Sequence, residues 1–143
     1  MKLEGTRDFA ASREAVYDAL TDAELVAAAI PALESVQVED HEHWTATVKI
    51  PVAPRLRVSF EVLDQRRPEH ARLHARGKNI GGAATVDTSF DLAQRDGTTT
   101  MIYEAEFGLS GLLGRIGEHA LRPIAERQLE KLLRAVEARI ARQ

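Results

Sequence analysis

The sequence predicts one α+β domain, in which an antiparallel sheet of up to seven strands curves around a long C-terminal helix. Three patterns support this. Apolar and polar residues alternate at the start of the chain and again over 33–109, apolar residues recur at helical spacing in two short segments between these regions, and helical spacing returns from 110 onward. A chain of 143 residues has the usual size of a single domain, so we expect residues 1–143 to share one core.

The chain opens with a predicted strand and two short helices. Residues 2–10 alternate, and one side of this strand carries Leu3, Gly5, Arg7 and Phe9. Ser12 is a candidate N-cap for a helix over 13–20. Asp22 can cap a second helix over 23–30, which must end near the proline that follows because the residue before a proline disfavours the helical conformation.

Six further strands fit into 33–109, because turn-forming residues interrupt the alternation. The interruptions fall at 40–42, 51–54, 67–69, 79–82 and 95–97. Such short connections join antiparallel neighbours, and Asp96-Gly97 is the sharpest hairpin signal. From Ser110 onward the spacing predicts the terminal helix, and Pro123 should kink or break it because proline lacks the N–H of the helical hydrogen bond.

Composition excludes several classes of protein. Cysteine is absent, so disulfides and thiolate metal sites are impossible. The formal net charge is −3, which provides no global field for nucleic acid, and we predict no nucleic-acid partner. No segment approaches the ~18 apolar residues of a membrane span, and no signal peptide is evident. We therefore expect a cytoplasmic protein, with peripheral contact at the inner membrane face as an open possibility.

Strand parity sorts the predicted sheet into two faces. The inner face is mainly apolar and comprises Trp44, Ala46, Val48, Val58, Phe60, Val62, Leu73, Ala75, Val86, Thr88, Phe90, Met101, Tyr103, Ala105 and Phe107. The outer face carries charges that can pair across strands, namely Arg55, Arg57, Glu61, Arg72, His74, Arg76, Asp87, Asp91, Glu104 and Glu106. A binding patch formed by Arg72, His74 and Arg76 is the alternative to a merely solvated outer face.

Two stretches and the order of elements carry a family resemblance. With FAASREAVYDALTD at 9–22 and IPALES at 30–35, the sequence resembles the START-like, or SRPBCC, helix-grip superfamily, and most closely its carbon monoxide dehydrogenase CoxG family. The resemblance runs over essentially the whole chain. It implies a deep hydrophobic ligand cavity between the sheet and the terminal helix. It also implies an accessory role beside a partner oxidoreductase, a molybdenum hydroxylase of the carbon monoxide dehydrogenase type.

Inner-face side chains and two leucines of the C-terminal segment are the expected lining of this cavity. They are Trp44, Val58, Phe60, Leu73, Thr88, Phe90, Met101, Tyr103, Phe107, Leu113 and Leu121. Of these, Tyr103, Trp44 and Thr88 would orient the polar end of a ligand. A movable mouth would be formed by Gly81, Gly82, Gly111 and Gly114. The alternative is that the side chains are ordinary core and that the glycines serve turns and close packing.

The sequence offers little for catalysis. It contains no phosphate loop, Gly-x-Ser-x-Gly or zinc-protease motif, and parity places almost all histidines and carboxylates outside the cavity. His41 and His43 lie at a predicted turn without a third ligand, so we expect no metal and no cofactor. The leading hypothesis is a non-enzymatic binding or carrier protein for a hydrophobic small molecule, such as a lipid or a quinone-like compound. The alternatives are an enzyme similar to polyketide cyclases and dehydratases, acting through Tyr103 or His119, and a protein-interaction module.

Overall fold

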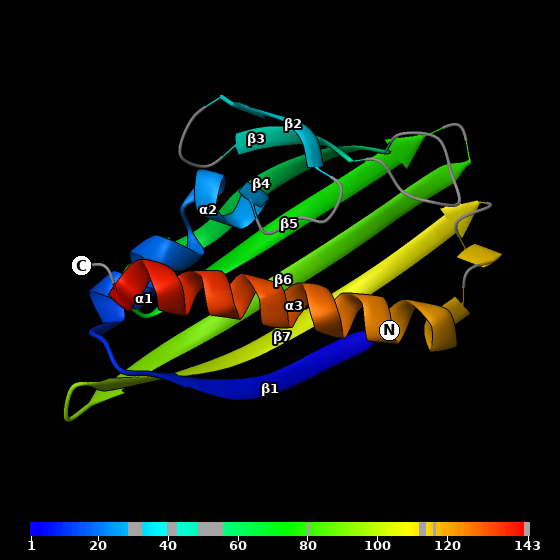
Figure 1. Cartoon of the computed structure of the whole chain (residues 1–143). Coiled ribbons are helices and arrows are strands. Elements are labelled where there is room, and N and C mark those ends of the chain that lie inside the picture. Colours follow the sequence, from blue (N-terminus) through cyan, green and yellow to red (C-terminus); the bar gives the residue numbers. More distant parts are fainter. Residues whose placement is uncertain are drawn as a thin grey trace.

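The computed structural model describes residues 1–28, 33–39, 43–48, 56–79, 81–111, 114–115 and 117–141. The strands are β1 (Lys2–Phe9), β2 (Leu33–Val38), β3 (His43–Val48), β4 (Leu56–Arg66), β5 (His70–Asn79), β6 (Gly82–Arg95) and β7 (Thr98–Gly111). The helices are α1 (Arg13–Leu20), α2 (Ala23–Ala28) and α3 (Gly117–Ala141). The described strands form a seven-stranded antiparallel sheet in the order β1-β7-β6-β5-β4-β3-β2, and α3 crosses one face of it (Figure 1).

Side-chain caps fix the starts of the two short helices, as predicted. The hydroxyl of Ser12 accepts a hydrogen bond from the backbone N–H of Ala15 at 3.2 Å. The carboxylate of Asp22 accepts from the N–H groups of Glu24 and Leu25 at 3.0 and 3.3 Å. These caps satisfy N–H groups that have no partner inside the helix. The described part of α2 ends at Ala28, and the remaining two residues predicted for this helix lie outside the described residues.

The C-terminal part differs from the prediction in two ways. The chain stays extended beyond Ser110, which pairs with Ala83 in the sheet, so β7 ends later than expected. Gly82 makes this possible, because a Cβ at that position would collide with the carbonyl oxygen of Ser110. The expected break at Pro123 is also wrong, since α3 runs through it. Proline removes one hydrogen bond in the early part of a 25-residue helix whose later half is packed against the core.

The two faces of the sheet follow the predicted parity. Of the inner-face residues, Trp44, Ala46, Val62, Ala75, Phe90, Met101 and Ala105 are buried. Of the outer-face residues, Arg57, Arg72, Arg76, Asp87, Asp91, Glu104 and Glu106 are exposed. Cross-strand pairs form on this outer face, because His74 Nδ1 lies 2.7 Å from Asp87 Oδ1 and the Lys2 ammonium lies 2.9 Å from Glu104. Arg55 and the side chain of Val48 lie outside the described residues.

The packed core lies under the C-terminal half of α3. Leu133 and Val136 of α3 belong to one cluster with residues of α1 and with Phe90, Leu92 and Met101 of the sheet. A smaller cluster joins α2 to β3, where the Trp44 ring stacks on Phe60 with 3.7 Å between ring centroids. Both clusters cover the part of the sheet nearest the two short helices.

Candidate functional site

The inner face of the sheet is only partly covered at its other end. Although their parity points inward, a group of small, apolar and hydroxyl residues there stays partly exposed: Val58, Phe60, Ala84, Val86, Thr88, Phe107 and Leu109. We call these residues the open end of the inner face. The N-terminal half of α3 lies over this end (Figure 1), and there Ala120 is exposed and Ile124 is 49% exposed. Uncovered apolar surface on both layers is the geometry of a binding site for an apolar ligand.

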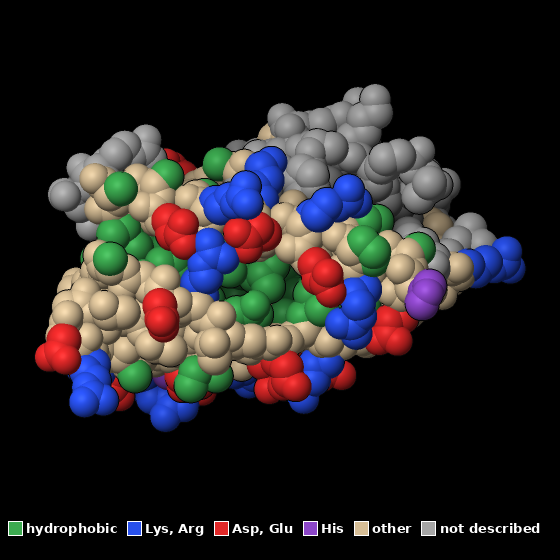
Figure 2. Space-filling view, turned by 60° about the horizontal axis from the view of Figure 1, so that its bottom comes forward, with side chains coloured by type: hydrophobic (Ala, Val, Ile, Leu, Met, Phe, Trp, Pro, Cys, Tyr) green, Lys and Arg blue, Asp and Glu red, His purple; other side chains and the backbone are tan. Residues whose placement is uncertain are grey.

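A hollow opens between strand β1 and helix α3. It has a volume of about 420 Å³ and is lined by Lys2, Leu3, Glu4, Tyr103, Arg122, Glu126 and Leu129. We call it the β1–α3 hollow. Viewed from the β1 edge, the surface is hollowed, with a hydrophobic floor and a rim of Lys, Arg, Asp and Glu side chains (Figure 2). Leu3 pairs across the sheet with Ala105, the inner-face neighbour of Phe107, so the hollow lies beside the open end of the inner face.

Ion pairs and a hydrogen bond join β1 to α3 on either side of this hollow. The Arg7 guanidinium contacts Glu130 at 2.8 Å and Glu137 at 2.6 Å. Hydrogen bonds to Glu130 and then Glu137 raise the pKa of Arg7, and the bond from Arg7 lowers the pKa of Glu130. On the other side, Arg122 donates to the carbonyl oxygen of Lys2 over 3.5 Å. The edge strand and the helix are therefore held together firmly at Arg7 and loosely at Arg122.

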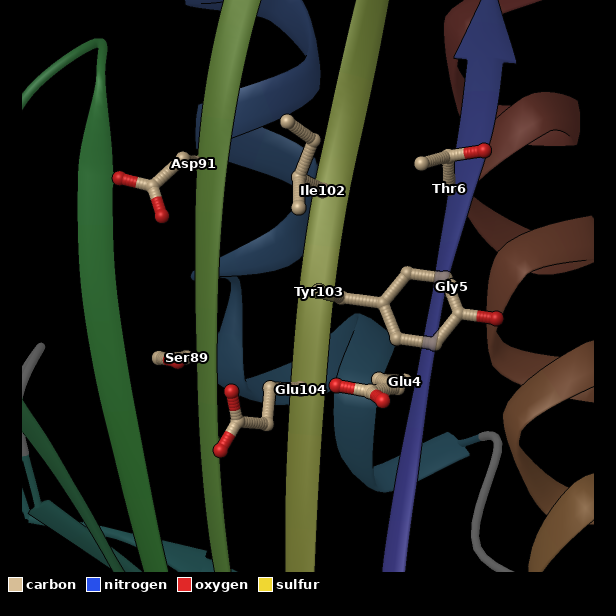
Figure 3. A pocket seen from close by; sticks show the side chains of 8 residues that line it. All are labelled: Glu4, Gly5, Thr6, Ser89, Asp91, Ile102, Tyr103 and Glu104. Carbon is tan, nitrogen blue, oxygen red and sulfur yellow. The ribbon is translucent and has the colours of Figure 1, made fainter.

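Tyr103 is placed in the hollow by the glycine opposite it. Gly5 pairs with Tyr103 across the sheet, and a Cβ on Gly5 would lie 2.7 Å from the Tyr103 hydroxyl oxygen. The absent side chain lets the ring lie over β1, with its hydroxyl directed to the side on which α3 runs (Figure 3). Within the described residues, this hydroxyl has no hydrogen-bond partner. It is a free donor at the wall of the hollow.

A second, shallower hollow lies where Tyr103 and Gly5 meet the outer face (Figure 3). It measures about 290 Å³, and Ile102 is 56% exposed in it. Its other lining residues are Glu4, Thr6, Ser89, Asp91 and Glu104. Asp91 pairs with a histidine at 2.9 Å and Glu104 with a lysine at 2.9 Å, so two of its three carboxylates already have partners within the protein.

The predicted ligand residues fall into two groups. Val58, Phe60, Leu73, Thr88, Tyr103, Phe107 and Leu121 are partly exposed, and Leu113 lies outside the described residues. Trp44, Phe90 and Met101 are at most 7% exposed inside the core clusters. These three therefore support the inner face from within and offer a ligand almost no surface. None of these placements tests ligand binding itself, so the lining remains a prediction.

The four glycines predicted to form the mouth are partly brought together. Gly82 and Gly111 face each other at the end of β6 and β7, and the carbonyl oxygen of Gly81 lies within 2.8 Å of where a Cβ of Gly111 would stand. Gly114 follows in the short described segment before α3. Their movement remains a prediction, and the β1–α3 hollow is a separate opening.

Sequence reasoning missed the helical side of the β1–α3 hollow. Arg122, Glu126 and Leu129 follow one another at i, i+4 and i+7, so they share one face of α3. That spacing is readable in the sequence. The approach of this face to the first strand is not, because it depends on contacts more than 100 residues apart, such as the one from Arg122 to Lys2.

The chemistry of the site favours binding. On the strands with described side chains, the inner-face parity holds no histidine and no carboxylate, so the sheet supplies no acid or base to the site. His119, named in the enzyme alternative, is exposed in the first turn of α3. His43 begins β3, where the sequence predicted a turn, and lies 3.5 Å from Glu61, while His41 is outside the described residues. Across the described part of the chain, no cluster of His, Asp and Glu has the geometry of a metal site.

The fold and the partly open inner face define a protein of the START-like helix-grip class. A solved START superfamily protein from Mycobacterium smegmatis has a TM-score of 0.72 at 13% identity over 99% of this chain and 97% of its own. A conserved protein from Geobacillus kaustophilus reaches 0.87 at 20% identity over 99% and 96%. The structure of Ara h 8.0201 gives 0.72 at 13% identity over 100% and 99%.

The model of the carbon monoxide dehydrogenase CoxG family matches residues 5–141, and the chain belongs to this family. No curated protein matches the sequence. Among the described helices, none is both long enough and apolar enough to cross a membrane.

Proposed function

We propose that this chain is a non-enzymatic binding or carrier protein for a hydrophobic small molecule, such as a lipid or a quinone-like compound. The ligand lies between the open end of the inner face and the N-terminal half of α3. The observation that carries the proposal is the contrast along one sheet: Phe90 and Met101 are sealed in the core, whereas Val86 and Phe107 on the same two strands remain partly exposed. Apolar surface left in a concave site is the usual basis of apolar ligand binding.

Family membership supports a finer part of the proposal. A chain of the CoxG family acts beside a molybdenum hydroxylase of the carbon monoxide dehydrogenase type, and the hydrophobic ligand links the chain to that partner. Titration of the purified hydroxylase with the ligand-loaded chain tests this part. A saturable complex is expected, and its absence at micromolar concentrations of both proteins contradicts the accessory role while leaving ligand binding intact.

The ligand is identified by native purification, organic extraction and mass spectrometry. An apolar compound present at near-stoichiometric amount is expected. Ala84 and Ala83 provide a matched pair of variants, because they are neighbours on β6 that face the inner and the outer side. Ala84→Phe fills the open end and should reduce the extracted ligand several-fold, whereas Ala83→Phe adds the same volume outside and should leave it unchanged. Equal extracts from both variants would contradict this location.

A further inference from the structure

The β1–α3 hollow contains two hydrogen-bond donors that the protein leaves unused or weakly used. The Tyr103 hydroxyl has no partner in the described part of the chain. The Arg122 guanidinium has only long contacts, at 3.5 Å to the Lys2 carbonyl, 3.6 Å to Glu118 and 4.0 Å to Glu126. Arg7 on the same helix–strand seam has partners at 2.6 and 2.8 Å, so Arg122 lacks the tight partners that charged hydrogen bonds normally have.

The charges around these donors are balanced. Lys2 and Arg122 contribute two positive charges to the lining of the hollow, and Glu4 and Glu126 contribute two negative ones. Lys2 is already engaged by Glu104 at 2.9 Å, which lies outside the lining of this hollow. A carboxylate or phosphate placed here would meet Glu4 and Glu126 at short range, and a cation would meet Arg122. Both kinds of ion are therefore disfavoured, and a neutral acceptor is not.

We propose that the β1–α3 hollow binds the polar head of the hydrophobic ligand, and that this head is a neutral group with an acceptor oxygen, such as a ketone, ester or amide carbonyl. Tyr103 Oη–H and the Arg122 guanidinium donate to this oxygen. Leu3 and Leu129 line the same hollow and contact the first apolar part of the ligand, whose remainder continues onto the open end of the inner face. The inference rests on the proposed function, because it assigns the head-group end of that site.

Three fluorescent probes separate the head-group site from the apolar site. Diphenylhexatriene is a hydrocarbon without a head group, Prodan is a naphthyl ketone with a neutral acceptor oxygen, and anilinonaphthalene sulfonate is an anion. Binding of diphenylhexatriene to the wild-type chain tests the proposed function. Selective loss of Prodan affinity in variants of the hollow tests the head-group site. We expect wild-type affinity in the order Prodan above anilinonaphthalene sulfonate.

The variants are Tyr103→Phe and Arg122→Met, each of which keeps the bulk of the side chain and removes the donor. Each should weaken Prodan binding by about threefold to tenfold, the effect of one net hydrogen bond, and should change diphenylhexatriene binding by less than about twofold. Arg127→Met is the control, because Arg127 is an exposed arginine of α3 outside the lining of the hollow. It should change neither affinity.

Each outcome decides something. Equal losses for Prodan and diphenylhexatriene, or no loss for either in the two variants, overturn the head-group site and leave the proposed function standing. Stronger wild-type binding of anilinonaphthalene sulfonate than of Prodan, lost in Arg122→Met, overturns the neutral class in favour of an anionic head. Failure of the wild-type chain to bind both Prodan and diphenylhexatriene overturns the proposed function together with its head-group site. Circular dichroism melting curves establish that each variant is folded.

Discussion

At the scale of single residues, Gly5 explains why a tyrosine can stand at an edge strand with its hydroxyl free. A Cβ on Gly5 would lie 2.7 Å from the Tyr103 hydroxyl oxygen and 3.0 Å from the ring carbon that bears it. Gly5→Ala should therefore push the ring out of the β1–α3 hollow, lower the free energy of unfolding by about 1–2 kcal/mol, and weaken Prodan binding. Urea denaturation and the probe titration measure the two effects.

A second glycine variant controls for the general effect of a methyl group. A Cβ on Gly114 would lie 3.5 Å from the nearest heavy atom, which is an ordinary contact distance. Gly114→Ala should leave stability unchanged or slightly raised, since alanine restricts the unfolded chain more than glycine does. If Gly5→Ala proved as harmless as Gly114→Ala, the ring of Tyr103 would not depend on the glycine opposite it.

At the scale of elements, Asp22 connects the start of α2 to the end of α3. Its carboxylate caps α2 and contacts the Arg139 guanidinium at 2.8 Å. Partial burial raises the pKa of Asp22, but the hydrogen bonds from Arg139, Leu25 and Glu24 together lower it further, so the pKa lies below the ordinary value. A lowered pKa means that the charged form stabilises the fold above about pH 4, and that this stabilisation is lost as the pH falls through the folded-state pKa.

Two substitutions divide the contribution of Asp22 into cap and charge. Asp22→Asn retains a capping oxygen and loses the charge, so it should cost about 1 kcal/mol at pH 7 and progressively less at lower pH. Asp22→Ala also loses the cap, and its extra cost should persist at low pH. Glu24→Gln, at an exposed position of α2, controls for the removal of a negative charge. A cost of Asp22→Asn that is the same at pH 7 and pH 3 would contradict the ion-pair explanation.

The same scale shows how far local sequence signals reach. Ser12 and Asp22 were predicted as caps and act as caps, because capping depends on residues within three positions. The end of β7 was predicted too early, because glycines and Ser110 are poor strand formers, and the extension depends on pairing with the start of β6. Pro123 was overvalued as a breaker, because packing of Leu133 and Val136 stabilises α3 beyond its local propensity.

At the scale of the whole molecule, the site lies where the two ends of the chain meet. Parity placed Tyr103 on the inner face and Arg7 on the same side of its strand as Leu3, and both placements hold. The sequence did not predict that β1 faces α3, because Arg7 and Glu137 are separated by 130 positions. The predicted glycine mouth therefore lies at the end of the sheet, whereas the β1–α3 hollow opens along its edge.

The Arg7 ion pairs are the firm connection of that edge, so their removal should loosen α3 from β1. Arg7→Met keeps the aliphatic length of the side chain and should lower the urea midpoint. A double-mutant cycle with Glu137→Gln should give a coupling free energy of a few tenths to about 1 kcal/mol, as for other partly exposed pairs, and 1 M salt should reduce it. Arg134→Met is the control, because the 3.1 Å ion pair of Arg134 with Glu130 lies within α3 itself and does not reach β1. Additive effects of Arg7→Met and Glu137→Gln at low salt would show that packing alone holds α3 against the first strand.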